Sequence, residues 1–85
     1  MIIKYHRDFT KAYKKLPSNV KDKLKERLVL FEQDKFNPLL NNHSLKGKYL
    51  GLRSINITGD LRAIYRHDGN VAIFVVIDIH SNLYG

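Results

Sequence analysis

The run VAIFVVIDI, Val71–Ile79, constrains the fold of this chain more than any other stretch. It is rich in β-branched residues and is apolar at odd and even positions alike, which is typical of a strand covered on both faces. Asp68-Gly69-Asn70, directly before it, is a hairpin-turn signal. We therefore expect a central β-strand that a tight turn joins to an antiparallel neighbour.

Two further strands are predicted before that turn. Leu61–Arg66 carries apolar residues and follows the turn signal Thr58-Gly59, and the pattern of Leu50–Ile57 also suits a strand. Because the turns between these segments are short, we expect the last three strands to form an antiparallel meander.

The first part of the chain has a helical period instead. After a short strand at Ile2–Tyr5, apolar residues recur at the spacing of one helical face on both sides of Pro17, which ends the first helix. The second helix should end before Asn37-Pro38, because a residue that precedes proline avoids the helical region. Residues 8–36 are therefore expected to form an antiparallel helix pair. The two apolar faces consist of Phe9, Ala12, Tyr13 and Leu16, then Val20, Leu24, Leu28 and Phe31.

The order of these elements defines the fold class. One strand, two helices and three strands predict an α+β domain, β-α-α-β-β-β, in which a helical hairpin packs on one face of an antiparallel sheet. A chain of 85 residues has the length of one domain and contains no long linker, so we expect a single domain over residues 1–85.

A charged residue stands in the middle of the second strand of the meander. Arg62 follows Asp60 by two residues in the sequence TGDLRAIY. Side chains alternate along a strand, so Arg62 shares a face with Ile64 and Arg66, opposite the face that packs on the helices. Since burying an unpaired charge costs several kcal/mol, we expect Arg62 to lie in an open, solvated groove.

Charge composition indicates the kind of partner. The chain has 15 Lys and Arg against 8 Asp and Glu, a net charge of +7, which favours nucleic acid, an anionic membrane or an acidic protein, unless the lysines only solubilise the surface. The absence of cysteine excludes disulfides and thiolate metal sites and fits the reducing cytoplasm. The N-terminus MIIKYHRDF turns charged by the fourth residue and has no long apolar run, so we expect no signal peptide. No run approaches the roughly 20 apolar residues of a membrane span, and of the possible partners we expect no membrane.

Histidines supply the other candidate chemistry. His43, in the connector NNHSLKGKY, and His80, at the end of the last strand, could converge with Asp60 and Arg62 at one edge of the meander. Histidine titrates at about pH 6.5, so two histidines can act as general base and general acid at neutral pH. Arginine presents a planar charged fork to a phosphate. Such a set could cleave RNA by attack of a 2′-hydroxyl on the neighbouring phosphorus, and no metal-ligand spacing is present.

An RNA-binding track is the second part of this hypothesis. Lys46, Lys48 and Arg53 surround the connector, and Tyr49 and Tyr84 could stack on bases. The alternative is a solvated basic loop with ordinary core tyrosines, and spacing alone does not decide between these two interpretations.

Three motifs carry a resemblance to a known family. HSLKGKYLGLRSINI, TGDLRAIY and IDIHSNLYG have the order and distances found in the RelE/ParE superfamily of bacterial toxin–antitoxin toxins. Within it, the whole chain, residues 1–85, resembles the YafQ-type ribosome-dependent mRNA endonucleases (mRNA interferases). The resemblance implies metal-independent cleavage of mRNA in the A site of the 70S ribosome, without a cofactor and under the control of a cognate antitoxin protein.

The resemblance also implies roles for particular positions. His43 matches the connector histidine, a candidate general base, and Asp60 matches an acidic residue implicated in catalysis or in orienting a histidine. Arg62 falls where several relatives have the arginine that stabilises the transition state. His80 matches the C-terminal histidine, the candidate general acid, and Tyr84 matches the terminal aromatic residue that contacts substrate.

One position departs from that pattern. YafQ-type relatives often have a histidine four residues before the acidic residue, where this chain has Asn56, which cannot shuttle a proton at neutral pH. The general base therefore stays open between His43 and Asp60. Two other functions also stay open. One is a non-catalytic toxin of the ParE type that inhibits DNA gyrase, against which His43 and His80 argue. The other is a non-enzymatic module that binds RNA or the ribosome.

Overall fold

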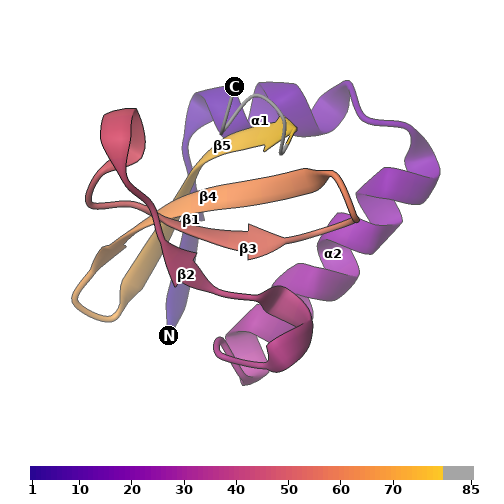
Figure 1. Ribbon diagram of the computed structural model, residues 1–85. Helices are drawn as coiled ribbons and strands as arrows, with labels where there is room; N and C mark the ends of the chain where they lie inside the picture. The colour runs from indigo at the N-terminus through magenta and orange to yellow at the C-terminus, as the bar shows by residue number, and fades with distance from the viewer. Residues whose placement is uncertain (80–85) are drawn as a thin grey trace.

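The computed structural model describes residues 1–79, and the helices and strands follow the predicted order (Figure 1). The α+β fold class is thus confirmed. The strand β2 was not predicted, because a strand of two residues leaves no periodic pattern in the sequence. The elements are β1 (Ile2–Tyr5), α1 (Arg7–Lys14), α2 (Ser18–Gln33), the short 3-10 helix η1 (Pro38–Leu40), β2 (His43–Ser44), the short 3-10 helix η2 (Gly47–Tyr49), β3 (Arg53–Asn56), β4 (Leu61–Asp68) and β5 (Val71–Ile79).

The strands of residues 1–79 form one mixed sheet in the order β1-β5-β4-β3-β2. The expected antiparallel meander is present in β3, β4 and β5, and β2 extends it at the edge. In contrast, β1 pairs with β5 in parallel, from Ile2 opposite Val71 to Tyr5 opposite Phe74. A parallel pair needs a long connection, and both helices and the rest of the meander lie between β1 and β5 in the sequence.

Both helices lie behind the sheet in Figure 1 and cover one of its faces. Phe9 of α1 and Leu24 and Phe31 of α2 are buried there. Phe74 of β5 lies at the centre of this core, because its ring centroid is 5.3 Å from that of Phe31 and 5.2 Å from that of Tyr65. Neither helix within residues 1–79 is long and apolar enough to cross a membrane. The other buried residues of the cluster are Leu40, Ile55, Ile57, Ala63 and Ala72.

A β-bulge accounts for the apolar pattern on both faces of β5. The register between β4 and β5 slips by one residue at Ile64 and Tyr65, which leaves Val75 as an extra residue. The slip lets Phe74 and Ile77, three positions apart, both pack into the helix-side core. The central position predicted for this strand is confirmed, since β5 lies between β1 and β4.

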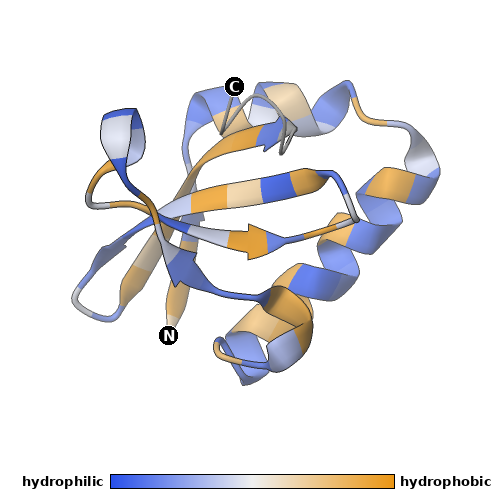
Figure 2. Ribbon diagram, viewed as in Figure 1, coloured by the Kyte–Doolittle hydropathy of each residue, from blue (hydrophilic) through white to orange (hydrophobic). Residues whose placement is uncertain are grey.

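The face of the sheet away from the helices is also partly buried. Figure 2 shows β5 as largely apolar, whereas β4 is hydrophilic toward its end and apolar in its first half, except for a hydrophilic break near its start. Arg62 belongs to that part of β4 and is 8% exposed, so the expected open and solvated position is wrong. The physical reason is that Arg62 lies directly opposite Asp78 on β5, and an acidic neighbour lowers the electrostatic cost of burying a cation. The residues buried outside the helix-side cluster are Leu45, Ser54, Arg62 and Ile64.

Candidate active site

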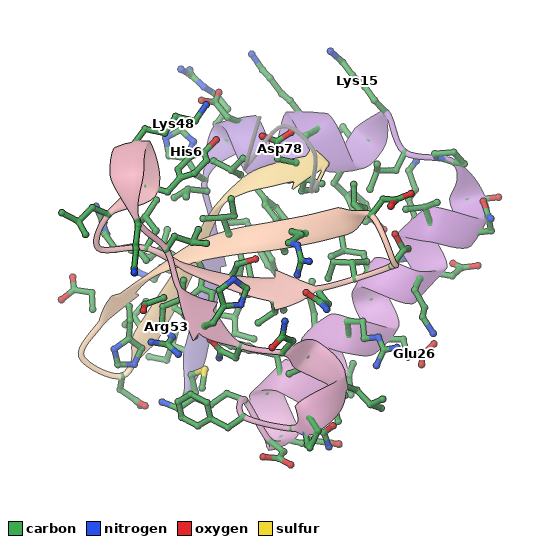
Figure 3. All side chains as sticks on the ribbon, in the orientation of Figure 1. His6, Lys15, Glu26, Lys48, Arg53 and Asp78 are labelled. Carbon is green, nitrogen blue, oxygen red and sulfur yellow. The ribbon has the colours of Figure 1, made fainter. Side chains whose placement is uncertain are left out.

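Arg62 lies in a row of polar residues that crosses the sheet. Its direct cross-strand partners are Asn56 on β3 and Asp78 on β5. Residues directly opposite each other share a face, so these side chains lie together on the face away from the helices. Figure 3 shows Asp78 near the end of β5. An acidic residue on the neighbouring strand lowers the electrostatic cost of burying the Arg62 cation.

His43 lies on the same face, one row further along the strands. His43 pairs with Ser54, which in turn pairs with Ile64. Ser54 lies two residues before Asn56 on β3, and Ile64 lies two residues after Arg62 on β4, so both share a face with that polar row. With strands about 4.8 Å apart and a rise of about 3.3 Å per residue, the Cα atoms of His43 and Arg62 are roughly 12 Å apart. The sheet therefore presents an imidazole and a guanidinium on one face.

The imidazole of His43 is held by the backbone that precedes it. Its Nδ1 lies 2.7 Å from the carbonyl oxygen of Asn41. Asn41 ends η1 and adopts the left-handed conformation, with φ 44° and ψ 50°. Asparagine is one of the few residue types that adopt this conformation at low cost.

Asn42 anchors the connector to three other parts of the chain. Its Nδ2 donates to the hydroxyl of Tyr65 at 2.8 Å and to the carbonyl oxygen of Lys35 at 3.0 Å. Its Oδ1 accepts a hydrogen bond from Nε of Arg53 at 2.9 Å. No sequence pattern singled out Asn42. The one available signal was the pair of asparagines directly before His43.

Arg53 belongs to this anchor and lies on the helix side of the sheet. It pairs with Tyr65, a core residue, and its guanidinium carbon lies 5.7 Å from the ring centroid of Phe36. Figure 3 shows Arg53 at the start of β3, whereas Asp78 lies near the end of β5. These contacts give Arg53 a structural role, and its expected role in substrate binding stays a prediction.

Asp60 lies in the turn before β4 and is exposed. The hydroxyl oxygen of Thr58 accepts hydrogen bonds from the backbone nitrogens of Asp60 and Leu61, at 3.3 and 3.0 Å. The acidic residue directly across from Arg62 is thus Asp78 and not Asp60. Sequence reasoning missed Asp78, although it is the one charge in the run VAIFVVIDI.

The basic residues of the connector lie around η2. Lys46 and Lys48 are both exposed, and Nζ of Lys48 lies 5.1 Å from the ring centroid of Tyr49. Figure 3 shows Lys48 on the loop that projects from the sheet. His80 and Tyr84, to which roles were also assigned, lie outside the described residues.

Metal ligands do not gather in the described part of the chain. Residues 1–79 contain no group of three or more His, Cys, Asp or Glu that could hold a metal ion. The candidate chemistry of the described face comes from imidazole, guanidinium and carboxylate groups.

Comparison with known proteins identifies the class of protein. The family model described as bacterial toxin of type II toxin–antitoxin system, YafQ, matches residues 1–85. The chain therefore belongs to the YafQ family and is a toxin of a toxin–antitoxin system. This confirms the resemblance inferred from the three sequence motifs. Among curated proteins, none matches this chain.

Solved structures share the fold over nearly the whole chain. YafQ from E. coli has 23% sequence identity and a TM-score of 0.79, covering 98% of this chain and 97% of its own. The E. coli DinJ–YafQ toxin–antitoxin complex matches with 24% identity and a TM-score of 0.76, covering 98% and 96%. A YoeB/ParE toxin from Agrobacterium tumefaciens matches with 20% identity and a TM-score of 0.75, covering 94% and 99%.

Proposed function

We propose that this toxin is a ribosome-dependent mRNA endonuclease that needs neither a metal ion nor a cofactor. The observation that supports it is a buried arginine, Arg62, and an imidazole, His43, on one face of the sheet in a chain of the YafQ toxin family. A strand with neighbours on both sides holds a phosphate-binding cation in one orientation more rigidly than a loop does. An activity directed at bacterial ribosomes places the toxin in the cytoplasm.

The proposed reaction is an internal transfer at one phosphodiester. A general base, His43 or Asp60, removes the proton of the 2′-hydroxyl, and the 2′-oxygen forms a bond to the adjacent phosphorus. The bond from phosphorus to the 5′-oxygen breaks, and His80 donates a proton to that oxygen. The products are a 2′,3′-cyclic phosphate and a 5′-hydroxyl. Arg62 stabilises the negative charge that develops on the phosphoryl oxygens.

Substrate binding is assigned to the basic connector and the C-terminal aromatic residue. Lys46 and Lys48 are exposed and Lys48 lies next to the ring of Tyr49, which suits contacts to phosphates and bases. Arg53 and Tyr84 complete the proposed set. With a net charge of +7, binding to mRNA and ribosomes should weaken steeply as salt is raised.

An antitoxin is the proposed regulatory partner. The E. coli DinJ–YafQ toxin–antitoxin complex is a solved assembly of this family. For the present chain, we expect a cognate antitoxin with acidic segments, because the toxin is strongly basic. Its gene should lie beside that of the toxin, and co-expression should abolish toxicity.

The test combines the toxin with mRNA and bacterial ribosomes and maps the cuts by primer extension. We expect cleavage that persists in a chelator and yields the cyclic phosphate and 5′-hydroxyl ends. The variant His80→Ala should be folded and inactive, and full turnover by it would remove His80 from the mechanism. Gyrase-linked DNA breaks with intact mRNA would support the ParE-type alternative, and ribosome binding without cleavage would support the non-enzymatic one.

A further inference from the structure

We infer that Asn41 and Asn42 are positioning residues that hold His43 as the tautomer protonated on Nδ1, so that Nε2 carries the lone pair of a general base. The catalytic purpose of this arrangement rests on the proposed nuclease function. The tautomer itself is a property of the folded toxin and can be measured without any activity.

The contact between His43 and Asn41 determines the tautomer. A carbonyl oxygen can only accept a hydrogen bond, so at 2.7 Å from the oxygen of Asn41 the Nδ1 of His43 must be the donor. A neutral imidazole carries one proton, and Nε2 is then the nitrogen with the lone pair. Of the two candidate bases, His43 and Asp60, this geometry favours His43.

The backbone conformation of Asn41 sets the direction of its own carbonyl group. Among residues 1–79, Asn41 is the one non-glycine residue with a positive φ. Glycine adopts this region freely and asparagine does so at modest cost, whereas a β-branched side chain clashes with the backbone there. The residue type at position 41 therefore controls whether the carbonyl can point at His43.

The side-chain bonds of Asn42 hold the same carbonyl group in place. The peptide bond that contains the Asn41 carbonyl continues into Asn42, whose side chain is bonded to Tyr65, Lys35 and Arg53. Tyr65 is 1% exposed and is part of the core. The carbonyl that orients His43 is thus tied through Asn42 to the rigid centre of the protein.

The experiment measures the tautomer of His43 by NMR. Long-range proton–nitrogen correlation spectra of uniformly ¹⁵N-labelled toxin at about pH 8.5, where a histidine is neutral, distinguish a protonated from a bare ring nitrogen. We expect the Nδ1-protonated form in the wild type and in Asn41→Gly, because glycine keeps the left-handed conformation. Asn41→Val and Asn42→Ala should shift the population toward the Nε2-protonated form, which dominates in free histidine.

Cleavage assays with ribosomes then separate this inference from the proposed function. If the wild type cleaves mRNA, Asn41→Val should lower the rate constant at saturating ribosomes at least tenfold, with Asn41→Gly retaining most of it. If the wild type does not cleave, the proposed function is wrong, but the spectra still decide the tautomer. An Nε2-protonated His43 in the wild type, or unchanged spectra in folded Asn41→Val, would overturn the inference.

Discussion

Arg62 near the start of β4 lies directly opposite Asp78 near the end of β5, and this pairing places a cation that is 8% exposed beside an acidic residue on the neighbouring strand. A guanidinium has five N–H donors in a fixed fork. It can therefore keep contacts within the protein and still present donors to a phosphate. In the proposed mechanism, the burial that sequence reasoning did not expect would hold Arg62 more rigidly against a phosphate than an exposed arginine could be held.

Arg62 should be needed for cleavage but not for folding. Removing a group that stabilises developing charge typically costs about 100- to 1,000-fold in rate, so Arg62→Met should lose at least that much. Arg62→Lys should lose a similar factor, because a lysine is a point charge without the planar fork. The measurements are single-turnover cleavage with ribosomes and the thermal unfolding midpoint.

Arg66→Ala is the matched control for these variants. Arg66 is on the same strand as Arg62 and is exposed. We expect its cleavage rate to stay within about threefold of the wild type, since a surface charge contributes little. Wild-type activity of folded Arg62→Met, or an equal loss in Arg66→Ala, would contradict the role given to Arg62.

Asp78 and Arg62 should be energetically coupled. Asp78→Asn leaves a buried cation without its acidic neighbour, so it should destabilise the wild type more than it destabilises an Arg62→Met background. Adjacent residues of this kind typically give a coupling energy of about 0.5–3 kcal/mol. Urea unfolding of the wild type, both single variants and the double variant measures it, and additive effects would show that the two residues act independently.

The Asn42 anchor should contribute to global stability. Asn42→Ala removes its bonds to Tyr65 and Lys35 and leaves the Nε of Arg53 without this acceptor. A cost of about 2 kcal/mol is expected, which lowers the unfolding midpoint of a domain of this size by roughly 8–16 °C. Tyr65→Phe removes one of these bonds and should cost about 1 kcal/mol. A loss in Asn42→Ala no larger than that in Tyr65→Phe would contradict the three-way anchor.

Alkaline pH should destabilise the toxin through Tyr5. Partial burial of Tyr5, which is about half exposed, together with the nearby charge of Glu32, raises the pKa of Tyr5 above its usual value. A pKa that is raised in the folded state gives stability that is fully present below the unfolded pKa of about 10 and is lost as the pH rises through the folded pKa. Tyr5→Phe keeps the ring that stacks on Phe9 and removes the ionisation. The thermal unfolding midpoint of this variant should therefore fall less steeply with pH than that of the wild type above about pH 10.

Tyr49→Phe is the control for the alkaline effect. Tyr49 lies in η2, away from the ring cluster of Tyr5, Phe9 and Phe74. In thermal melts across the alkaline range, the unfolding midpoint of the Tyr49→Phe protein should fall with pH about as steeply as that of the wild type. If Tyr5→Phe shows that same slope as well, Tyr5 is not the source of the alkaline loss.

Most of the fold was predictable from local patterns. The helical spacing before Pro17, the turn at Gly69 and the strand Val71–Ile79 each depend on residues within one segment, and each was located correctly. The connector histidine, His43, and the mid-strand Arg62 were also singled out as candidates from the sequence. Local periodicity and turn chemistry determine such features because they act over a few residues.

Other features required the tertiary structure, because they join residues that are distant in the sequence. The parallel pairing of β1 with β5, the bulge at Val75 and the placement of Asp78 across from Arg62 all depend on strand register. The bond between Asn42 and Tyr65 spans 23 positions. Register is set by packing and by cross-strand contacts of the whole sheet. The sequence by itself therefore determined the long helices and strands and several of the candidate chemical groups, whereas the assembled sheet decided which groups meet and added β2, Asn42 and Asp78 to the site.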